Sequence, residues 1–160
     1  MTGIPDIRLT PIGYVHSSRR DLEDDSWDTV KSRIELTDAF GPEAFDGIEE
    51  FSHAEIVFVF DRARESEITS GARRPRGNPA WPRVGIFAQR GSRRPNLLGA
   101  TIVRIIARNG RTLEVDGLDA VDGTPVVDIK PVMSEFLPRG AVRQPQWSTE
   151  LMRHYWRAHD

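Results

Sequence analysis

Arginine side chains gather beside a rigid corner in the stretch 85–99, which reads GIFAQRGSRRPNLLG. The guanidinium groups of Arg90 and Arg94 can each bind a carboxylate or a phosphate through two parallel hydrogen bonds. Pro95 fixes one backbone angle and Asn96 can hydrogen-bond to nearby backbone, so this corner should be rigid. The pattern indicates an anion-binding loop, and a basic surface loop without a ligand explains it equally well.

Carboxylates gather in the stretch 118–131, which reads LDAVDGTPVVDIKP. The Asp122–Gly123 pair predicts a turn, and Thr124 can hydrogen-bond to the backbone of that turn. Asp119 and Asp122 together can bind ribose hydroxyls or a cationic group. Because no histidine accompanies them, the carboxylates are a poor metal site and we expect no metal. A hairpin turn without a ligand is the alternative interpretation.

Two further candidates lie on expected strands. Asp128 and Lys130 are two residues apart, so their side chains should share one face of a strand, either as site residues or as an exposed ion pair. His53 begins a strongly apolar stretch, and a single histidine in that position is more often structural than catalytic.

The common catalytic signatures are missing from the sequence. It contains no glycine-rich dinucleotide fingerprint, no P-loop, no zinc-protease helix motif and no hydrolase nucleophile elbow. Cysteine is absent too, which excludes a disulfide framework and a thiolate metal site.

The net charge of −2 hides an uneven distribution. Acidic residues dominate between positions 21 and 50, whereas positions 69–112 hold ten arginines and no acidic residue. Such a positive region can attract phosphate or a carboxylate ligand. A genome that favours arginine codons also explains arginine in place of lysine, but it does not explain the missing acids.

Positioning these groups requires strands, and segments rich in β-branched residues with partial alternation recur along the chain. The expected strands span 7–17, 32–37, 53–61, 83–88, 99–108, 112–118 and 125–130. The Asn-Gly pair within 108–111 predicts a tight hairpin turn, because both residues tolerate positive φ.

Two helices are expected, a short one beginning near Pro42 and a C-terminal one over 147–158. Many strands that are not interleaved with helices predict a mainly β fold, a barrel or a strongly curved sheet, and argue against a doubly wound sheet. A chain of 160 residues fits one domain over 1–160. The stretch 65–82 is rich in Gly, Pro and Asn, and we interpret it as a functional loop.

The N-terminus has no secretory signal pattern, and no apolar run could cross a bilayer. We therefore expect a cytoplasmic protein without a membrane partner.

Taken together, three blocks resemble the TrmO family, also called TsaA-like. They are GIFAQRGSRRPNLLGAT, LDAVDGTPVVDIKPV, and the pair IGYVHS and GIEEFSH, in the family's order and spacing over 12–131. The family consists of S-adenosylmethionine-dependent methyltransferases that act on N6-threonylcarbamoyladenosine beside the tRNA anticodon. The resemblance implies a single-sheeted β-barrel with short flanking helices, usually a homodimer, and a methyltransferase activity.

The resemblance also implies a cofactor site for S-adenosylmethionine. Its contacts would be Asp61, Arg62, Phe87, Ala88, Arg90, Arg94, Asn96, Ala100, Asp119, Asp122, Gly123 and Thr124.

Transfer of the methyl group to a nitrogen needs positioning and desolvation more than an activated side chain. Asp122 could take the released proton or only hold the ribose, and Lys130 could steer an anionic substrate. Arg73, Arg74 and Arg76 are the candidates for contacts to tRNA phosphates. Three alternatives stay open: a small-molecule methyltransferase, a cofactor-binding regulator without turnover, and an RNA-binding module without a cofactor.

The chain departs from the family pattern at several places. Gln89, Gly91, Leu97 and Val132 replace the usual residues of the blocks, and the acidic stretch 24–27 stands where many members carry an Arg-Gln-Pro loop. The larger C-terminal domain of longer members is replaced by the tail EFLPRGAVRQPQWSTELMRHYW.

Overall fold

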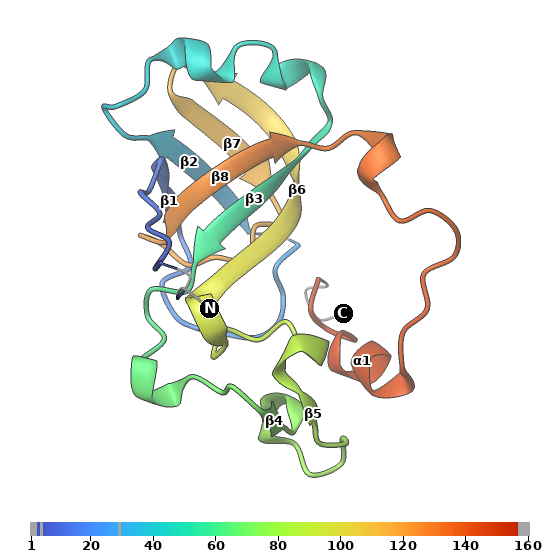
Figure 1. Ribbon diagram of the computed structural model, residues 1–160. Helices are drawn as coiled ribbons and strands as arrows, with labels where there is room; N and C mark the ends of the chain where they lie inside the picture. The colour runs from blue at the N-terminus through green and yellow to red at the C-terminus, as the bar shows by residue number, and fades with distance from the viewer. Residues whose placement is uncertain (1–2, 4, 29, 157–160) are drawn as a thin grey trace.

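A closed barrel of antiparallel strands forms the body of the computed structural model, which describes residues 3, 5–28 and 30–156 (Figure 1). The order around the barrel is β1, β2, β7, β6, β3, β8. These strands are β1 (Gly13–Ser17), β2 (Lys31–Leu36), β3 (His53–Val59), β6 (Leu98–Asn109), β7 (Thr112–Asp116) and β8 (Pro125–Pro131). The expected mainly β barrel is confirmed, and six of the seven expected strands contribute to it.

Alternation along each strand fills the barrel interior. In β2 every second residue is buried, beginning with Ser32 and Ile34, because neighbouring side chains of a strand point to opposite faces. Phe58 of β3 is among the largest fully buried side chains. Its ring lies against Gly99 of β6, where a Cβ atom would come within 2.6 Å of two ring carbons. A glycine is therefore required at that crossing.

The strand directions define two ends of the barrel. At the lower end in Figure 1, strands β1, β3 and β7 finish and strands β2, β6 and β8 begin. The hairpin between β6 and β7 lies at the upper end, as the Asn-Gly pair predicts. Its positive φ of 61° falls on Gly110, while Asn109 stays in the strand and pairs with Thr112.

A second, two-stranded sheet lies below the barrel and contains β4 (Ala72–Arg73) and β5 (Val84–Gly85) (Figure 1). The prediction of one strand over 83–88 is wrong, because the chain leaves β5 after two residues and forms the 3-10 turn η5 (Ile86–Ala88). The buried amide of Gln89 stabilises this arrangement by donating hydrogen bonds of 3.0 Å to one carbonyl on each short strand.

The helix expected near Pro42 is two 3-10 turns, η1 (Pro42–Phe45) and η2 (Ile48–Glu50), which cover the upper end of the barrel. Gly47 separates them because its φ of 85° is incompatible with a continuous helix. Further 3-10 turns are η3 (Glu65–Glu67), η4 (Pro75–Gly77), η6 (Pro95–Leu97) and η7 (Ser134–Phe136). The expected loop 65–82 thus contains η3, β4 and η4.

The C-terminal helix α1 spans Gln146–Leu151 and is shorter than the expected 147–158, whose last two residues lie outside the described part of the chain. The helix stops because the backbone carbonyls of residues 154, 155 and 156 accept hydrogen bonds from the N–H groups of residues 26, 27 and 28. Within the described ranges, no helix is both long and apolar enough to cross a membrane.

Candidate functional site

The loops at the lower end of the barrel bring together most of the predicted site residues. Asp61 and Arg62 directly follow β3, the stretch 87–96 leads into β6, and the stretch 119–124 connects β7 to β8. Because β3 and β7 end where β6 and β8 begin, these three segments meet at one edge of the barrel. The antiparallel strand order therefore brings the three segments together in space, which the order of the motifs in the sequence alone could not show.

Lys130 lies elsewhere. It is five residues along β8 from Pro125, about 17 Å at the usual rise per residue. Its ammonium group contacts the Asp128 carboxylate at 2.7 Å on the exposed face of the strand. The hydrogen bond and charge of Asp128 raise the pKa of Lys130. His53 begins β3 at the upper end and pairs with Ser52. The structure therefore brings neither residue to the loops of the lower end.

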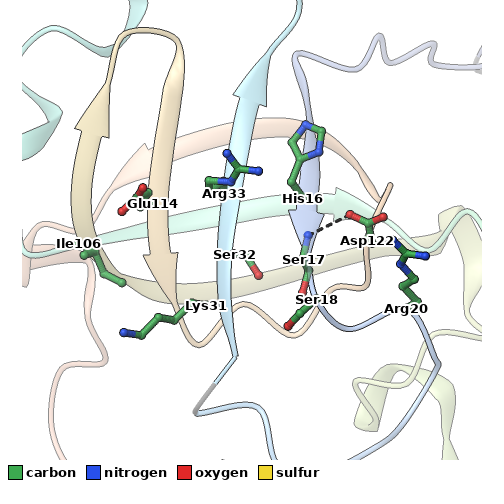
Figure 2. Close-up of a pocket in the computed structure, with 10 residues that line it drawn as sticks. All are labelled: His16, Ser17, Ser18, Arg20, Lys31, Ser32, Arg33, Ile106, Glu114 and Asp122. Atoms are coloured by element: carbon green, nitrogen blue, oxygen red, sulfur yellow. Dashed lines mark hydrogen bonds between the residues drawn. The ribbon is translucent and has the colours of Figure 1, made fainter.

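Asp122 is fixed to the end of β1 and to the loop after β3. Its Oδ1 accepts a hydrogen bond of 3.0 Å from the Ser17 backbone N–H, the dashed line in Figure 2. Its own N–H donates to the carbonyl of Arg19 at 2.8 Å, and its carbonyl accepts a hydrogen bond of 3.4 Å from Arg62. The other carboxylate oxygen, Oδ2, has no partner among the described residues, so Asp122 can accept one more donor from a ligand.

A groove of about 630 Å³ runs beside Asp122 along β1, β2 and β7, within the size range of small-molecule sites. Three exposed cations, Arg20, Lys31 and Arg33, line it without an ion pair to any described residue. The full lining, drawn in Figure 2, is His16, Ser17, Ser18, Arg20, Lys31, Ser32, Arg33, Ile106, Glu114 and Asp122. The Ser32 side chain is buried on the opposite face of β2 from Lys31 and Arg33, so its hydroxyl, which lacks a partner in the described part of the chain, does not serve the groove. The three exposed cations make the groove suited to a ligand that carries anionic groups.

Asp119 is held by two hydroxyl groups. Thr101 on β6 donates to Oδ1, and Tyr155 in the C-terminal tail donates to Oδ2. Burial and the adjacent Asp119 carboxylate raise the pKa of the Tyr155 hydroxyl well above its usual value. Tyr155 is therefore a neutral donor throughout the physiological pH range, and its contact with Asp119 was not predicted from the sequence.

The arginines of the corner donate hydrogen bonds to backbone carbonyls of the chain. Arg90 donates to the carbonyl of Ala100 at 2.5 Å, and Arg94 donates to the carbonyl of Gln89 at 2.6 Å. Asn96 and Leu97 both have positive φ, 66° and 54°, which is uncommon for asparagine and unfavourable for leucine. Such backbone strain is typical of functional loops. The corner thus brings predicted cofactor residues together, and its arginine side chains stabilise the loop through hydrogen bonds to backbone carbonyls.

Apolar side chains complete this loop. Phe87 is 78% exposed, and Ala88 beside it is exposed too. An exposed phenylalanine offers a flat face on which a ligand ring can stack.

The arginines predicted to contact phosphate are largely occupied within the chain. Arg74 donates to the carbonyls of Pro79 at 3.2 Å and Trp81 at 2.5 Å. Arg76 pairs with Asp25 at 3.0 Å, so the acidic stretch 24–27 neutralises part of the basic loop. Arg73 differs, because its Nε is buried without a partner among the described residues. The opposite charges of the acidic stretch 24–27 and the basic loop were the signal in the sequence for the pair of Arg76 with Asp25.

Known proteins similar to this chain share its barrel. Residues 21–136 match the family model described as the tRNA-methyltransferase O N-terminal domain. A probable S-adenosyl-L-methionine-binding protein of Pyrococcus abyssi is 35% identical over 139 residues, covering 83% of this chain and 72% of that protein. The tRNA (adenine(37)-N6)-methyltransferase of Escherichia coli is 39% identical over 112 residues, 65% of this chain and 46% of that enzyme.

Solved structures agree with these similarities. A crystal structure of TrmO from Pseudomonas aeruginosa superposes with a TM-score of 0.72 and 27% identity, and the match covers 92% of this chain and 64% of that chain. The chain thus spans about half to two thirds of several longer relatives. The segment 137–156, with α1 and Tyr155, lies beyond the residues that match the family model.

Proposed function

From the premise that the chain belongs to the tRNA-methyltransferase O N-terminal domain family, we propose that it is an S-adenosylmethionine-dependent methyltransferase that modifies an adenosine of tRNA. The acceptor is proposed to be N6-threonylcarbamoyladenosine beside the anticodon. Support comes from relatives named as S-adenosylmethionine-binding proteins and as tRNA (adenine(37)-N6)-methyltransferases.

The observation that carries the proposal is the meeting of the three predicted cofactor segments at the lower end of the barrel. Asp119, Asp122 and Phe87 present two carboxylates and an exposed ring at that end. The donor and acceptor types fit the cofactor, because carboxylates can accept ribose hydroxyls or face a sulfonium and an aromatic ring can stack on adenine.

S-adenosylmethionine, when bound, supplies a methyl group on a positively charged sulfur. The chain has to align the acceptor nitrogen with that carbon and exclude water, for which no nucleophilic side chain is needed. The acceptor nitrogen loses one proton as its new bond to carbon forms. Asp122 is the proposed holder of that proton, since it lines the groove and its Oδ2 has no partner among the described residues.

The proposed path for the tRNA backbone follows the cations of the groove. Arg20, Lys31 and Arg33 are exposed and unpaired among the described residues, whereas Arg74 and Arg76 are bound to carbonyls and carboxylates of the chain. Of the three arginines predicted to contact phosphate, Arg73 has an Nε that is buried without a partner among the described residues, so that atom is not accessible to a phosphate. A tRNA substrate is the reason for proposing a cytoplasmic location.

A methyl-transfer assay tests the proposal. Purified chain and radiolabelled S-adenosylmethionine are mixed with tRNA that carries threonylcarbamoyladenosine and with the same tRNA lacking it. Transfer to the modified tRNA alone supports the proposed acceptor. Transfer to neither, with cofactor binding intact, favours a small-molecule acceptor or a regulator without turnover, and absence of cofactor binding favours an RNA-binding module.

We also propose a homodimer. The connecting segment 132–145 exposes Phe136 at 86% and Val142 at 70%, and a second copy covering them would remove apolar surface from water. Light scattering that returns the monomer mass at micromolar concentration would contradict the dimer.

A further inference from the structure

The C-terminal tail returns to the site from the opposite end of the barrel. After β8 ends, the chain passes down the side of the barrel to α1, beside the small sheet (Figure 1). There the indole nitrogen of Trp81 donates a hydrogen bond of 2.9 Å to Glu150 on α1. The segment 137–156 lies beyond the residues that match the family model, and this hydrogen bond joins it to the loop between β4 and β5.

The end of the tail is built into the fold. The Trp27 N–H donates to the Tyr155 carbonyl at 2.8 Å, and the Asp28 N–H donates to the Trp156 carbonyl at 2.9 Å. The Tyr155 ring packs in a cluster with Trp27, Val30 and Val121, of which Trp27 is 4% exposed. A ring held by backbone and core contacts is a fixed part of the structure, unlike a lid that opens.

The fixed ring aims its hydroxyl at Asp119. Thr101 donates to one carboxylate oxygen and Tyr155 to the other, so rotation of the carboxylate would break both bonds. Each oxygen of an ionised carboxylate can accept a second hydrogen bond. The two hydroxyls therefore orient Asp119 without using up its capacity for a ligand. The main chain beside it is fixed too, because Leu118 and Ala120 are buried.

On the premise of the proposed function, we propose that Tyr155 is a positioning residue of the cofactor site, which orients Asp119 to accept hydrogen bonds from S-adenosylmethionine. Because this role concerns binding, removal of the Tyr155 hydroxyl should raise the dissociation constant and the KM of the cofactor and leave kcat nearly unchanged. The opposite role, a hydroxyl that competes with the ligand for Asp119, predicts tighter binding when the hydroxyl is removed.

The test is calorimetric titration of S-adenosylmethionine into the full chain and its Tyr155→Phe variant, which keeps the packed ring. We expect the variant to bind about fivefold more weakly, the effect of one ordinary hydrogen bond. Tyr14→Phe is the matched control, because Tyr14 is the other tyrosine and lies exposed on β1. Thermal melting of each variant checks that the fold is retained.

A double-mutant cycle separates positioning from general support of the fold. In the Asp119→Asn background, Tyr155→Phe should cause no further weakening, because an amide has a single acceptor oxygen and Thr101 and Tyr155 can no longer each hold one oxygen of the group. Thr101→Val should weaken binding to a similar extent as Tyr155→Phe, since it removes the other donor.

Weakening in Tyr155→Phe that disappears in the Asp119→Asn background supports the positioning role. Unchanged or tighter binding in Tyr155→Phe, or losses that multiply in the double variant, overturns that role while leaving the proposed function intact. A wild-type chain that binds no S-adenosylmethionine overturns both.

Discussion

The indole nitrogen of Trp81 donates a hydrogen bond to the Glu150 carboxylate at 2.9 Å across 69 positions of sequence. This contact joins the loop between β4 and β5 to α1, and Gln146 donates to the other oxygen of the same carboxylate at 3.0 Å. Glu150 thereby anchors α1, which precedes the tail carbonyls of residues 154–156 that accept hydrogen bonds from residues 26–28.

Replacement of Glu150 by alanine should loosen the tail without unfolding the barrel. Loss of a hydrogen bond worth about 1 kcal/mol would raise local opening about fivefold. The measurement is amide hydrogen exchange at Trp27 and Asp28, whose N–H groups bind tail carbonyls. Glu135→Ala is the control, because Glu135 contacts only its neighbour Ser134 among the described residues. Equal protection in both variants would contradict the role of Glu150.

Gly99→Ala should destabilise the barrel by about 1–3 kcal/mol, the usual cost of an overpacked core. The new methyl group would lie 2.6 Å from the ring of Phe58, which is 1% exposed and cannot move aside. Urea unfolding measures the loss as a lower midpoint with an unchanged slope. Gly85→Ala serves as the matched control, since a Cβ there meets nothing within 4 Å. A Gly99→Ala midpoint equal to that of the control would show that the rings can yield.

Tyr155 gives stability a dependence on pH in the alkaline range. Burial raises the pKa of its hydroxyl in the folded chain above the unfolded value of 10.0, so the folded state binds more protons above that pH. The contribution of Tyr155 to the free energy of unfolding is therefore fully present below pH 10. It decreases as the pH rises further, with a limiting slope of about 1.4 kcal/mol per pH unit.

The Tyr155→Phe variant should lack this alkaline loss of stability. The comparison with the wild type is best made in about 1 M salt, because salt screens the exposed Lys130–Asp128 pair far more than a buried contact. Unfolding curves that decline equally above pH 10 in both chains would contradict the assignment.

Asp122→Asn should weaken S-adenosylmethionine binding about tenfold or more, because a hydrogen bond to a charged acceptor is worth about 1.5–3 kcal/mol. The fold should survive, since an amide oxygen can still accept the Ser17 N–H. Asp128→Asn is the control, because Asp128 also accepts a backbone N–H, from Ile129 at 2.9 Å, but lies on β8 beside Lys130. If both variants bind like the wild type in calorimetry, Asp122 is not a cofactor contact.

Alternation and turn chemistry predicted the barrel because both are local properties. The strands expected over 32–37 and 99–108 form as β2 and β6, and the Asn-Gly hairpin joins β6 to β7. The prediction of a strand over 83–88 failed. Its apolar residues suit a strand, but the buried Gln89 amide donates to two carbonyls and stabilises a turn instead. A long-range hydrogen bond of that kind leaves no periodic trace in the sequence.

For the site, too, local signals were predictive and long-range contacts were not. Motif order brought Asp61, Arg90 and Asp122 into one hypothesis, and strand direction places their loops at one end of the barrel. The contact of Tyr155 with Asp119 spans 36 positions and depends on the path of an irregular tail. The neighbours of Lys130 in sequence suggested a site residue, but strand length carries it away from the loops.

Lys31→Gln should reduce the salt dependence of tRNA binding. Lys31 begins β2 and lines the groove, is exposed, and has no ion-pair partner among the described residues. If it neutralises one phosphate, its loss should lower the slope of log K against log salt by about 0.7–0.9. Filter binding or fluorescence anisotropy over about 50–200 mM salt provides that slope.

Arg111→Gln is the control for this charge, because Arg111 pairs with Asp38 at 3.0 Å at the hairpin end of the barrel. Its slope should equal that of the wild type, whereas Lys31→Gln and Arg33→Gln should each lose about one contact and the double variant about two. Equal slopes for Lys31→Gln and Arg111→Gln would mean that the tRNA does not follow the groove. A loss instead in Arg73→Gln would direct the backbone over the small sheet, to which Arg73 belongs.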